Sequence, residues 1–213
     1  HDCLLLLDTV TSLGGVPLYL DEWKVDMAYS CSQKGLSCPP GLGPFTMGPR
    51  AEAKLAARKD KVPNWYLDVS LLNQYWGSDR VYHHTAPVNM NFGMREALRL
   101  LADEGLDNAW SRHRRNAEAL WKGLESLGLE MHVPEALRLP TLTTVRIPDD
   151  VDGKAFSSYL LNTHGIEVGG GLGALAGKIW RVGLMGYNST PENMNRLLNL
   201  FETELPRFRE GSC

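Results

Sequence analysis

Four consecutive leucines, Leu4–Leu7, are the stretch that most limits how this chain can fold. A continuous apolar run of this length is typical of a strand that is covered on both faces, as in a parallel sheet flanked by helices. The run ends at Asp8, and the polar segment 9–15 follows it and closes with two glycines. In open α/β sheets, ligands bind beyond the carboxyl ends of the strands. Asp8 is therefore expected either to cap a helix or to contact a ligand.

A second strand is expected at Val25–Tyr29, ahead of Ser30-Cys31-Ser32-Gln33-Lys34 and a turn-rich segment. A compact crossover would make the two strands parallel, with their carboxyl ends at one edge of the sheet. We expect Lys34, held by stiff backbone between hydroxyl residues and a tight turn, to be shielded from water. Desolvation disfavours an ammonium group and frees a lone pair that can attack an aldehyde. The alternative is a surface lysine beside a loop.

A carboxylate and a desolvated lysine at one sheet edge suit pyridoxal phosphate. The lysine would form a Schiff base with the aldehyde of the cofactor. The carboxylate of Asp8 would keep the pyridine nitrogen protonated, so that the ring withdraws electrons from the Cα atom of the substrate. Neither Asp8 nor Lys34 is specific alone, and the pair is the stronger signal.

Arg181 lies in a second informative strand, 179–184. Alternation with period 2 places Trp180, Val182 and Leu184 on one face and Arg181 on the other, with Gly183 leaving space beside it. A planar guanidinium in this position suits a bidentate grip on a carboxylate. The alternative is a structural ion pair, which is common for a buried arginine.

Two other segments are compared with known phosphate sites, and only the first is kept as a candidate. Tyr82-His83-His84-Thr85 has two adjacent histidines but no third ligand at helical or finger spacing, so we expect no metal site and consider phosphate contact instead. The glycine-rich segment 169–178 does not match a phosphate-binding P-loop, because Leu172 and Ile179 stand where glycine and Ser or Thr are required. It is either a mobile loop facing the site or a flexible hairpin connection.

Composition excludes several classes of function. The net charge is −3 and there is no long basic run, which argues against a nucleic-acid partner. No apolar run is long enough to span a bilayer. The four cysteines show no C-x-x-C spacing, so a reducing compartment is expected. The chain opens almost directly on a core strand without an initiator methionine, so we expect a fragment that lacks an N-terminal part.

The organisation predicted along the chain is α/β followed by α+β. Helices are expected at 51–61 and 92–103, and a change of composition at Glu104-Gly105 suggests a domain boundary. Beyond it, a long helix is expected from Asp107, strands at 141–147 and 166–168, and a last helix capped by Thr190. Residues 1–104 would then form part of a large, mainly parallel domain, and residues 105–213 a smaller α+β domain.

The motifs around Asp8, Lys34, Tyr82 and Arg181 together resemble the alanine–glyoxylate / serine–pyruvate aminotransferases, which are pyridoxal-phosphate enzymes of class V and fold type I. The resemblance covers essentially the whole chain in the right order. It implies that residues 1–104 are the C-terminal half of the cofactor-binding large domain and that 105–213 are the small C-terminal domain.

The resemblance also implies a role for each site residue. Lys34 is similar to the Schiff-base lysine that moves the proton at Cα, and Asp8 to the partner of the pyridine nitrogen. Gln33 is similar to a phosphate contact from the same subunit. Tyr82 and Thr85 resemble the pair that reaches the phosphate of the neighbouring subunit, which implies a homodimer. Arg181, the last of the set, resembles the clamp on the α-carboxylate of the substrate.

The implied reaction is transamination between a small amino acid, alanine or serine, and a 2-oxo acid such as glyoxylate or pyruvate. The family is peroxisomal or mitochondrial in eukaryotes, and a bacterial member would be cytoplasmic. Cysteine desulfurases are less similar, because they carry histidine where Gln33 precedes the lysine. A kynurenine-pathway transaminase of the same family, or a catalytically silent dimerisation relative, stays open as an alternative. The fragment alone is expected to be inactive.

Overall fold

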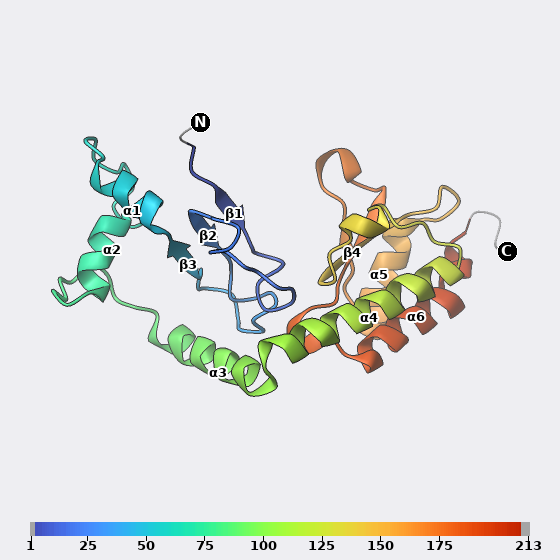
Figure 1. Cartoon of the computed structure of the whole chain (residues 1–213). Helices are drawn as coiled ribbons and strands as arrows, with labels where there is room; N and C mark the ends of the chain where they lie inside the picture. Colours follow the sequence, from blue (N-terminus) through green and yellow to red (C-terminus); the bar gives the residue numbers. More distant parts are fainter. Residues whose placement is uncertain (1–2, 210–213) are drawn as a thin grey trace.

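The computed structural model describes residues 3–209. The expectations that involve His1 and Cys213 therefore lie outside the described residues. It shows two small sheets joined along one side by a bent pair of long helices (Figure 1). The strands are β1 Leu6–Asp8, β2 Met27–Tyr29, β3 Phe45–Met47, β4 Leu142–Arg146, β5 Gly169–Gly170 and β6 Ile179–Gly183. The α-helices are α1 Pro49–Ala56, α2 Val69–Trp76, α3 Val88–Glu104, α4 Leu106–Ser126, α5 Gly153–His164 and α6 Pro191–Thr203.

The first sheet has the strand order β1-β2-β3. β1 and β2 are parallel, with Asp8 opposite Tyr29, and β3 pairs with β2 in the antiparallel sense. The predicted arrangement, in which the two strands end at one edge of a sheet, is confirmed. The expectation that both faces of β1 are covered is not met within residues 3–209, because Leu5 and Leu6 are 49% and 53% exposed.

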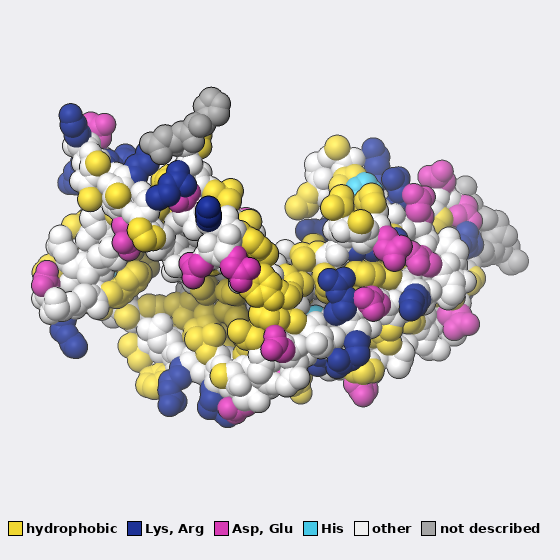
Figure 2. All heavy atoms as spheres, viewed as in Figure 1, with side chains coloured by type: hydrophobic (Ala, Val, Ile, Leu, Met, Phe, Trp, Pro, Cys, Tyr) yellow, Lys and Arg dark blue, Asp and Glu magenta, His cyan; other side chains and the backbone are white. Residues whose placement is uncertain are grey.

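A broad hydrophobic surface lies over the first sheet and α3 in Figure 2. Large apolar side chains that are exposed in these elements include Leu6 and Phe45 of the sheet and Phe92 and Leu98 of α3. An apolar surface of this kind usually marks a contact with another part of the protein or with a partner. Many apolar side chains in the first hundred residues are therefore exposed in the described chain.

α3 and α4 meet at Gly105, whose φ of 83° ends one helix and begins the next. Glycine adopts this left-handed conformation without the steric cost that a Cβ atom would bring. Beyond the bend, α4 runs below the second sheet and packs against α6 (Figure 1). The bend coincides with the predicted boundary at residues 104 and 105, and the division into two domains stays a prediction.

The second sheet is antiparallel, with the strand order β4-β6-β5. Trp180, Val182 and Leu184 are buried on its inner face, as the alternation predicted. Phe156 of α5 and Phe201 of α6 meet there with their rings edge to face, 5.0 Å between centroids. This cluster is the main hydrophobic core of the described chain.

The structure decides three expectations for this region. The hydroxyl of Thr190 accepts a hydrogen bond from the Asn193 amide (3.2 Å), which confirms the predicted cap of α6. The strand expected at 166–168 is wrong, since pairing with β6 begins only at Gly169. Within segment 169–178, residues 169–170 form β5 and residues 171–178 connect it to the antiparallel strand β6, which agrees with the hairpin alternative.

Candidate active site

Asp8 presents an oriented, ionised carboxylate at the end of β1. Its Oδ1 accepts a hydrogen bond from the Val10 amide (2.8 Å) and its Oδ2 accepts one from the Tyr29 hydroxyl (2.7 Å). The Val10 amide, and then Tyr29, hold the pKa of the Asp8 carboxyl below its usual range. Residues 9–15 form turns, so Asp8 does not cap a helix. The side chain is exposed and can still accept a further donor.

Lys34 lies in a turn whose shape is fixed by its neighbours. The buried Ser32 hydroxyl donates to the Pro39 carbonyl (2.7 Å), and the Ser32 amide donates to Leu42 O (3.0 Å). The Ser37 amide then closes the turn on the Lys34 carbonyl (2.9 Å). Lys34 is half-buried, and its amine has no hydrogen bond or ion pair with any residue between 3 and 209. The backbone is therefore held while the reactive nitrogen is left available.

The loop after Asp8 and the turn around Lys34 are in direct contact. The Thr9 hydroxyl donates to Tyr29 O (2.7 Å), and the Ser30 hydroxyl donates back to Thr9 O (3.0 Å). Gly35 lies so close to the Leu13 carbonyl that any Cβ atom at position 35 would collide with it. The two predicted strand ends are thus tied together at one edge of the sheet.

Arg181 lies on the outer face of β6, opposite Thr144 of β4 and Gly169 of β5. Its Nε donates to the Gly170 carbonyl (2.6 Å), and no carboxylate of residues 3–209 forms an ion pair with it. The structural ion pair considered from the sequence is therefore not present in the described chain. With respect to residues 3–209, both terminal nitrogens of the guanidinium are free to bind an anion, in the fork geometry that matches a carboxylate.

The segment after β6 connects Arg181 to the Lys34 turn. The Tyr187 amide donates to the Ser37 hydroxyl (2.8 Å). Gly186, with a φ of 59°, has no room for a Cβ atom, which would collide with Ser37 Oγ and lie 3.1 Å from Lys34 O. Within residues 3–209, no hydrogen bond or ion pair joins the side chains of Asp8, Lys34 and Arg181 to one another. They are related through these backbone contacts.

The three remaining predicted residues lie on the surface. Gln33 is exposed next to Lys34. The Tyr82 hydroxyl and Thr85 Oγ1 are 3.0 Å apart, and Tyr82 is 71% exposed. The intervening His83 stacks on Trp65, with 4.0 Å between ring centroids, and fixes this loop. No hydrogen bond within residues 3–209 joins Tyr82 or Thr85 to Lys34, so the two hydroxyls form a separate surface pair.

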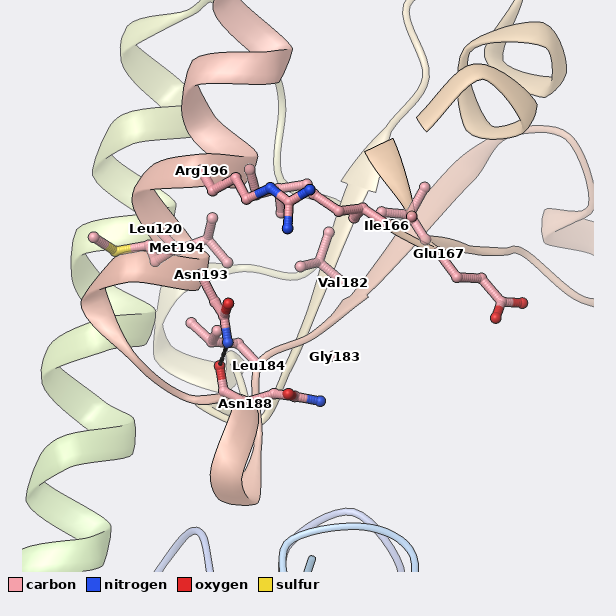
Figure 3. Close-up of a pocket in the computed structure, with 13 residues that line it drawn as sticks. Leu120, Ile166, Glu167, Val182, Gly183, Leu184, Asn188, Asn193, Met194 and Arg196 are labelled. Atoms are coloured by element: carbon pink, nitrogen blue, oxygen red, sulfur yellow. Dashed lines mark hydrogen bonds between the residues drawn. The ribbon is translucent and has the colours of Figure 1, made fainter. Parts of the chain in front are cut away.

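A cavity of about 250 Å³ lies beside β6 and α6. Figure 3 shows Arg196 reaching across it and Asn193 bonded to the Asn188 carbonyl (3.1 Å). The Arg196 guanidinium already donates to the His164 carbonyl (2.6 Å). The cavity shares Gly183 with the strand of Arg181 but contains neither Lys34 nor Asp8, and it is not the predicted site.

Sequence reasoning missed a group of polar residues on α4. Arg112, His113 and Asn116 contact the backbone of Gly186 and Ser189, and His113 and Asn116 are buried. The signal was present, because His113 and Asn116 share the buried stripe of α4 with Ala109 and Leu120. A polar residue in such a stripe requires a hydrogen-bonding partner, which the spacing alone does not identify.

Comparison with known proteins shows the family. The Aminotransferase class-V family profile matches residues 1–197. The chain belongs to the class V aminotransferases. Members of this family are pyridoxal-phosphate-dependent, and the mixed α/β chain is part of the larger fold type I of these enzymes.

Relatives of this class V aminotransferase include alanine–glyoxylate aminotransferase of Oryctolagus cuniculus, 47% identical over 92% of the chain and 51% of the relative. The (S)-ureidoglycine–glyoxylate transaminase of Bacillus subtilis is 36% identical over 99% of the chain and 55% of that protein. The crystal structure of an alanine–glyoxylate aminotransferase from Nostoc sp. superimposes with a TM-score of 0.91 at 65% identity, covering 93% of the chain and 53% of that structure. The chain spans about half the length of the curated relatives it matches.

The residues present fit pyridoxal phosphate. The cofactor requires a carboxylate that stays ionised and an amine that no neighbour occupies. Among residues 3–209, Asp8 at the end of β1 and Lys34 in the turn that follows the neighbouring strand β2 have these properties. Within residues 3–209 there is no helix long and apolar enough to cross a membrane.

Proposed function

We propose that the full-length protein transfers the amino group of a small amino acid, alanine or serine, to a 2-oxo acid such as glyoxylate or pyruvate. The proposal is supported by the names of the relatives, by the amine of Lys34, which has no partner among residues 3–209, and by the guanidinium of Arg181, which pairs with no carboxylate of those residues. Transamination needs a base that acts at Cα and a cation that holds the α-carboxylate. These two residues have the chemistry for both tasks.

Each residue has a separate role in this proposal. Pyridoxal phosphate supplies an electron-withdrawing ring that stabilises negative charge at the substrate Cα. Lys34 holds the cofactor through its amine and moves the proton at Cα. Asp8 places a negative charge against the ring nitrogen and so favours its protonated form. Gln33 binds the phosphate group from the same subunit.

In this proposal the protein is a homodimer, in which Tyr82 and Thr85 bind the cofactor phosphate of the neighbouring subunit. Their hydroxyls lie 3.0 Å apart on an exposed loop and can donate together to a phosphate. No hydrogen bond of the described chain joins them to its own Lys34, which supports a role across the interface. The proposed compartment is the peroxisome or mitochondrion in a eukaryote and the cytoplasm in a bacterium.

The observation that carries the proposal is the guanidinium of Arg181. A half-buried arginine usually pairs with an acidic side chain. Arg181 is anchored only through Nε to the Gly170 carbonyl, and the carboxylates of residues 3–209 leave its terminal nitrogens free. Such an arrangement keeps the fork oriented and available for a carboxylate that arrives with the substrate.

The lysine assignment is tested on the full-length protein with pyridoxal phosphate. We expect a visible absorption band that borohydride abolishes, and we expect Lys34→Ala to lack it. Lys122→Ala, a change at an exposed lysine of α4, is the matched control and should keep the band. A colourless wild-type protein would support the silent dimerisation relative instead.

The carboxylate assignment is tested by Arg181→Lys, which keeps the charge but loses the planar fork. We expect KM for both amino acid and 2-oxo acid to rise roughly 10–100-fold, the loss of one charge-assisted pair of hydrogen bonds. Arg114→Lys, on the exposed face of α4, is the control. An unchanged KM in Arg181→Lys would remove this residue from the site.

The amino acceptor is tested with a panel of 2-oxo acids. The names of both sets of relatives contain glyoxylate, whereas the amino donors differ, alanine in one and (S)-ureidoglycine in the other. We therefore expect glyoxylate to be an acceptor, and the second candidate function is transamination from ureidoglycine to glyoxylate. Failure of glyoxylate as acceptor would overturn both the alanine–glyoxylate and the ureidoglycine–glyoxylate assignments and favour the kynurenine-pathway alternative.

A further inference from the structure

Gly186 is held from two sides at the place where the small C-terminal region meets the Lys34 turn. On one side its α-carbon faces Ser37 Oγ and the carbonyls of Lys34 and Gly35, with no room for a side chain. On the other side lie Arg112 and His113 of α4. The Gly186 amide donates to His113 Nε2 (2.8 Å), and the Gly186 carbonyl accepts from Arg112 Nη1 (3.0 Å).

The hydrogen bonds of His113 define its protonation state. Its Nδ1 is 2.7 Å from the Ala109 carbonyl, which can only accept, so Nδ1 bears the proton. The Gly186 amide can only donate, so Nε2 must be unprotonated. The ring is therefore the neutral Nδ1–H tautomer, and a second proton on Nε2 would break the bond to Gly186.

The environment of His113 favours this neutral form. The side chain is 1% exposed, and burial lowers the pKa of the imidazole below its ordinary value of 6.5. The Arg112 cation lowers it further, while the Ala109 carbonyl and the Glu104 carboxylate act in the opposite direction. Gly15, which also approaches the ring, contributes no charge.

Arg112 is itself held by Glu104, the last residue of α3, and by Ser189 in the loop after β6. Its Nε and Nη2 donate to both carboxylate oxygens of Glu104 (2.5 and 2.8 Å). Its Nη1 donates to the carbonyl of Ser189 (2.9 Å) as well as to Gly186, and Asn116 donates to the same Ser189 carbonyl (2.8 Å). A bidentate pair of this kind leaves little freedom to the guanidinium.

We propose that His113 and Arg112 are positioning residues that hold Gly186 against the Lys34 turn and thereby fix Arg181 relative to Lys34. Gly186 follows Arg181 by one short segment, in which the Leu184 amide is also bonded to Thr141 O (3.2 Å). Holding the amide and the carbonyl of Gly186 therefore sets where the end of β6 lies. This inference rests on the proposed roles of Lys34 and Arg181 in the reaction.

The test uses the full-length protein with its cofactor and the substitutions His113→Leu and His113→Gln. Leucine removes both hydrogen bonds, whereas a glutamine side chain can donate to Ala109 O and accept from the Gly186 amide. We expect His113→Leu to raise KM for both substrates roughly tenfold, as the net loss of one or two hydrogen bonds implies, and His113→Gln to restore most of it. The matched controls are His132→Leu and His132→Gln, at a half-buried histidine of the same region.

A second measurement does not depend on activity. Hydrogen–deuterium exchange of the peptide spanning 184–189 should be faster in His113→Leu than in wild type and unchanged in the His132 variants. Arg112→Lys, which keeps the charge but loses the shared contacts, serves if His113→Leu does not fold, and should also speed exchange of this peptide.

The outcomes separate this inference from the proposed function. A wild-type enzyme that transaminates, with KM and exchange unchanged in His113→Leu, would overturn the positioning role alone. Equal KM effects in His113→Leu and His132→Leu would also overturn it. A wild-type protein without transaminase activity would overturn the proposed function. In that case, faster exchange of the peptide 184–189 in His113→Leu would still show that His113 restrains Gly186.

Discussion

Replacing Gly186 by alanine tests the close contact between the end of β6 and the Lys34 turn. The substitution has two separable costs. Alanine at a φ of 59° costs roughly 1–2 kcal/mol, because its Cβ atom crowds the carbonyl oxygen. The new Cβ atom would also collide with Ser37 Oγ and lie 3.1 and 3.3 Å from the carbonyls of Lys34 and Gly35. Overpacking of this kind costs roughly 1–3 kcal/mol.

Gly165→Ala isolates the first cost. Gly165 has a φ of 65° at the end of α5, and a Cβ atom there meets nothing within 4 Å. We therefore expect Gly165→Ala to lower the free energy of unfolding by about 1–2 kcal/mol and Gly186→Ala by about 2–5 kcal/mol. The measurement is urea unfolding of the full-length protein at one fixed protein concentration.

Ser37→Ala in the Gly186→Ala background refines the comparison. It removes the hydroxyl that the new Cβ atom would strike and leaves the two carbonyls in place. We expect partial recovery, with a coupling energy of roughly 0.5–3 kcal/mol between the two positions in a double-mutant cycle. An equal loss of unfolding free energy in Gly186→Ala and Gly165→Ala, together with zero coupling to Ser37, would refute the close contact of Gly186 with the Lys34 turn.

Three further predictions follow from single contacts. Tyr29→Phe removes a donor that keeps the pKa of Asp8 low, so that the loss of cofactor binding on acidification should occur at higher pH than in wild type, as followed by the visible band. Phe156→Ala, at a fully buried ring, should lower the free energy of unfolding by about 3–5 kcal/mol. The pKa of His113 is lower in the folded than in the unfolded protein, so neutral His113 contributes to stability above pH 6.5 and this contribution declines as the pH falls below that value. Urea unfolding across this pH range should show the decline in wild type. It should be absent in His113→Gln.

The elements that the sequence predicted are those with a local cause. Leu4–Leu7 is a short apolar run and Val25–Tyr29 is apolar except for Asp26; both precede turns, and such runs form strands wherever a sheet can accept them. The alternation around Arg181 placed Trp180 and Val182 in the core, because the side chains of a strand point to opposite faces. Thr190 before Pro191 specified the start of α6 through the requirements of a helix cap.

The elements that it missed depend on partners far away in the chain. α5 buries only two large side chains, Phe156 and Leu160, so its amphipathic pattern is weak. β5 consists of two glycines and becomes a strand only through its bonds to β6. The bond between His113 and Gly186 joins residues 73 positions apart, and no spacing rule connects them. Such contacts are decided by tertiary packing and not by propensity.

Different contacts position Asp8 and Arg181 relative to Lys34, so a substitution can disturb one of these two arrangements without the other. The position of Asp8 relative to Lys34 is set by the parallel register of β1 and β2 and by the bonds between Thr9, Tyr29 and Ser30. In our proposal, the position of Arg181 relative to Lys34 is set by the contacts of Gly186. Gly186→Ala should therefore raise KM for both substrates while leaving the visible cofactor band in place. Loss of the band in that variant would show that the Gly186 contacts also shape the Lys34 turn, and that cofactor and substrate are not held independently.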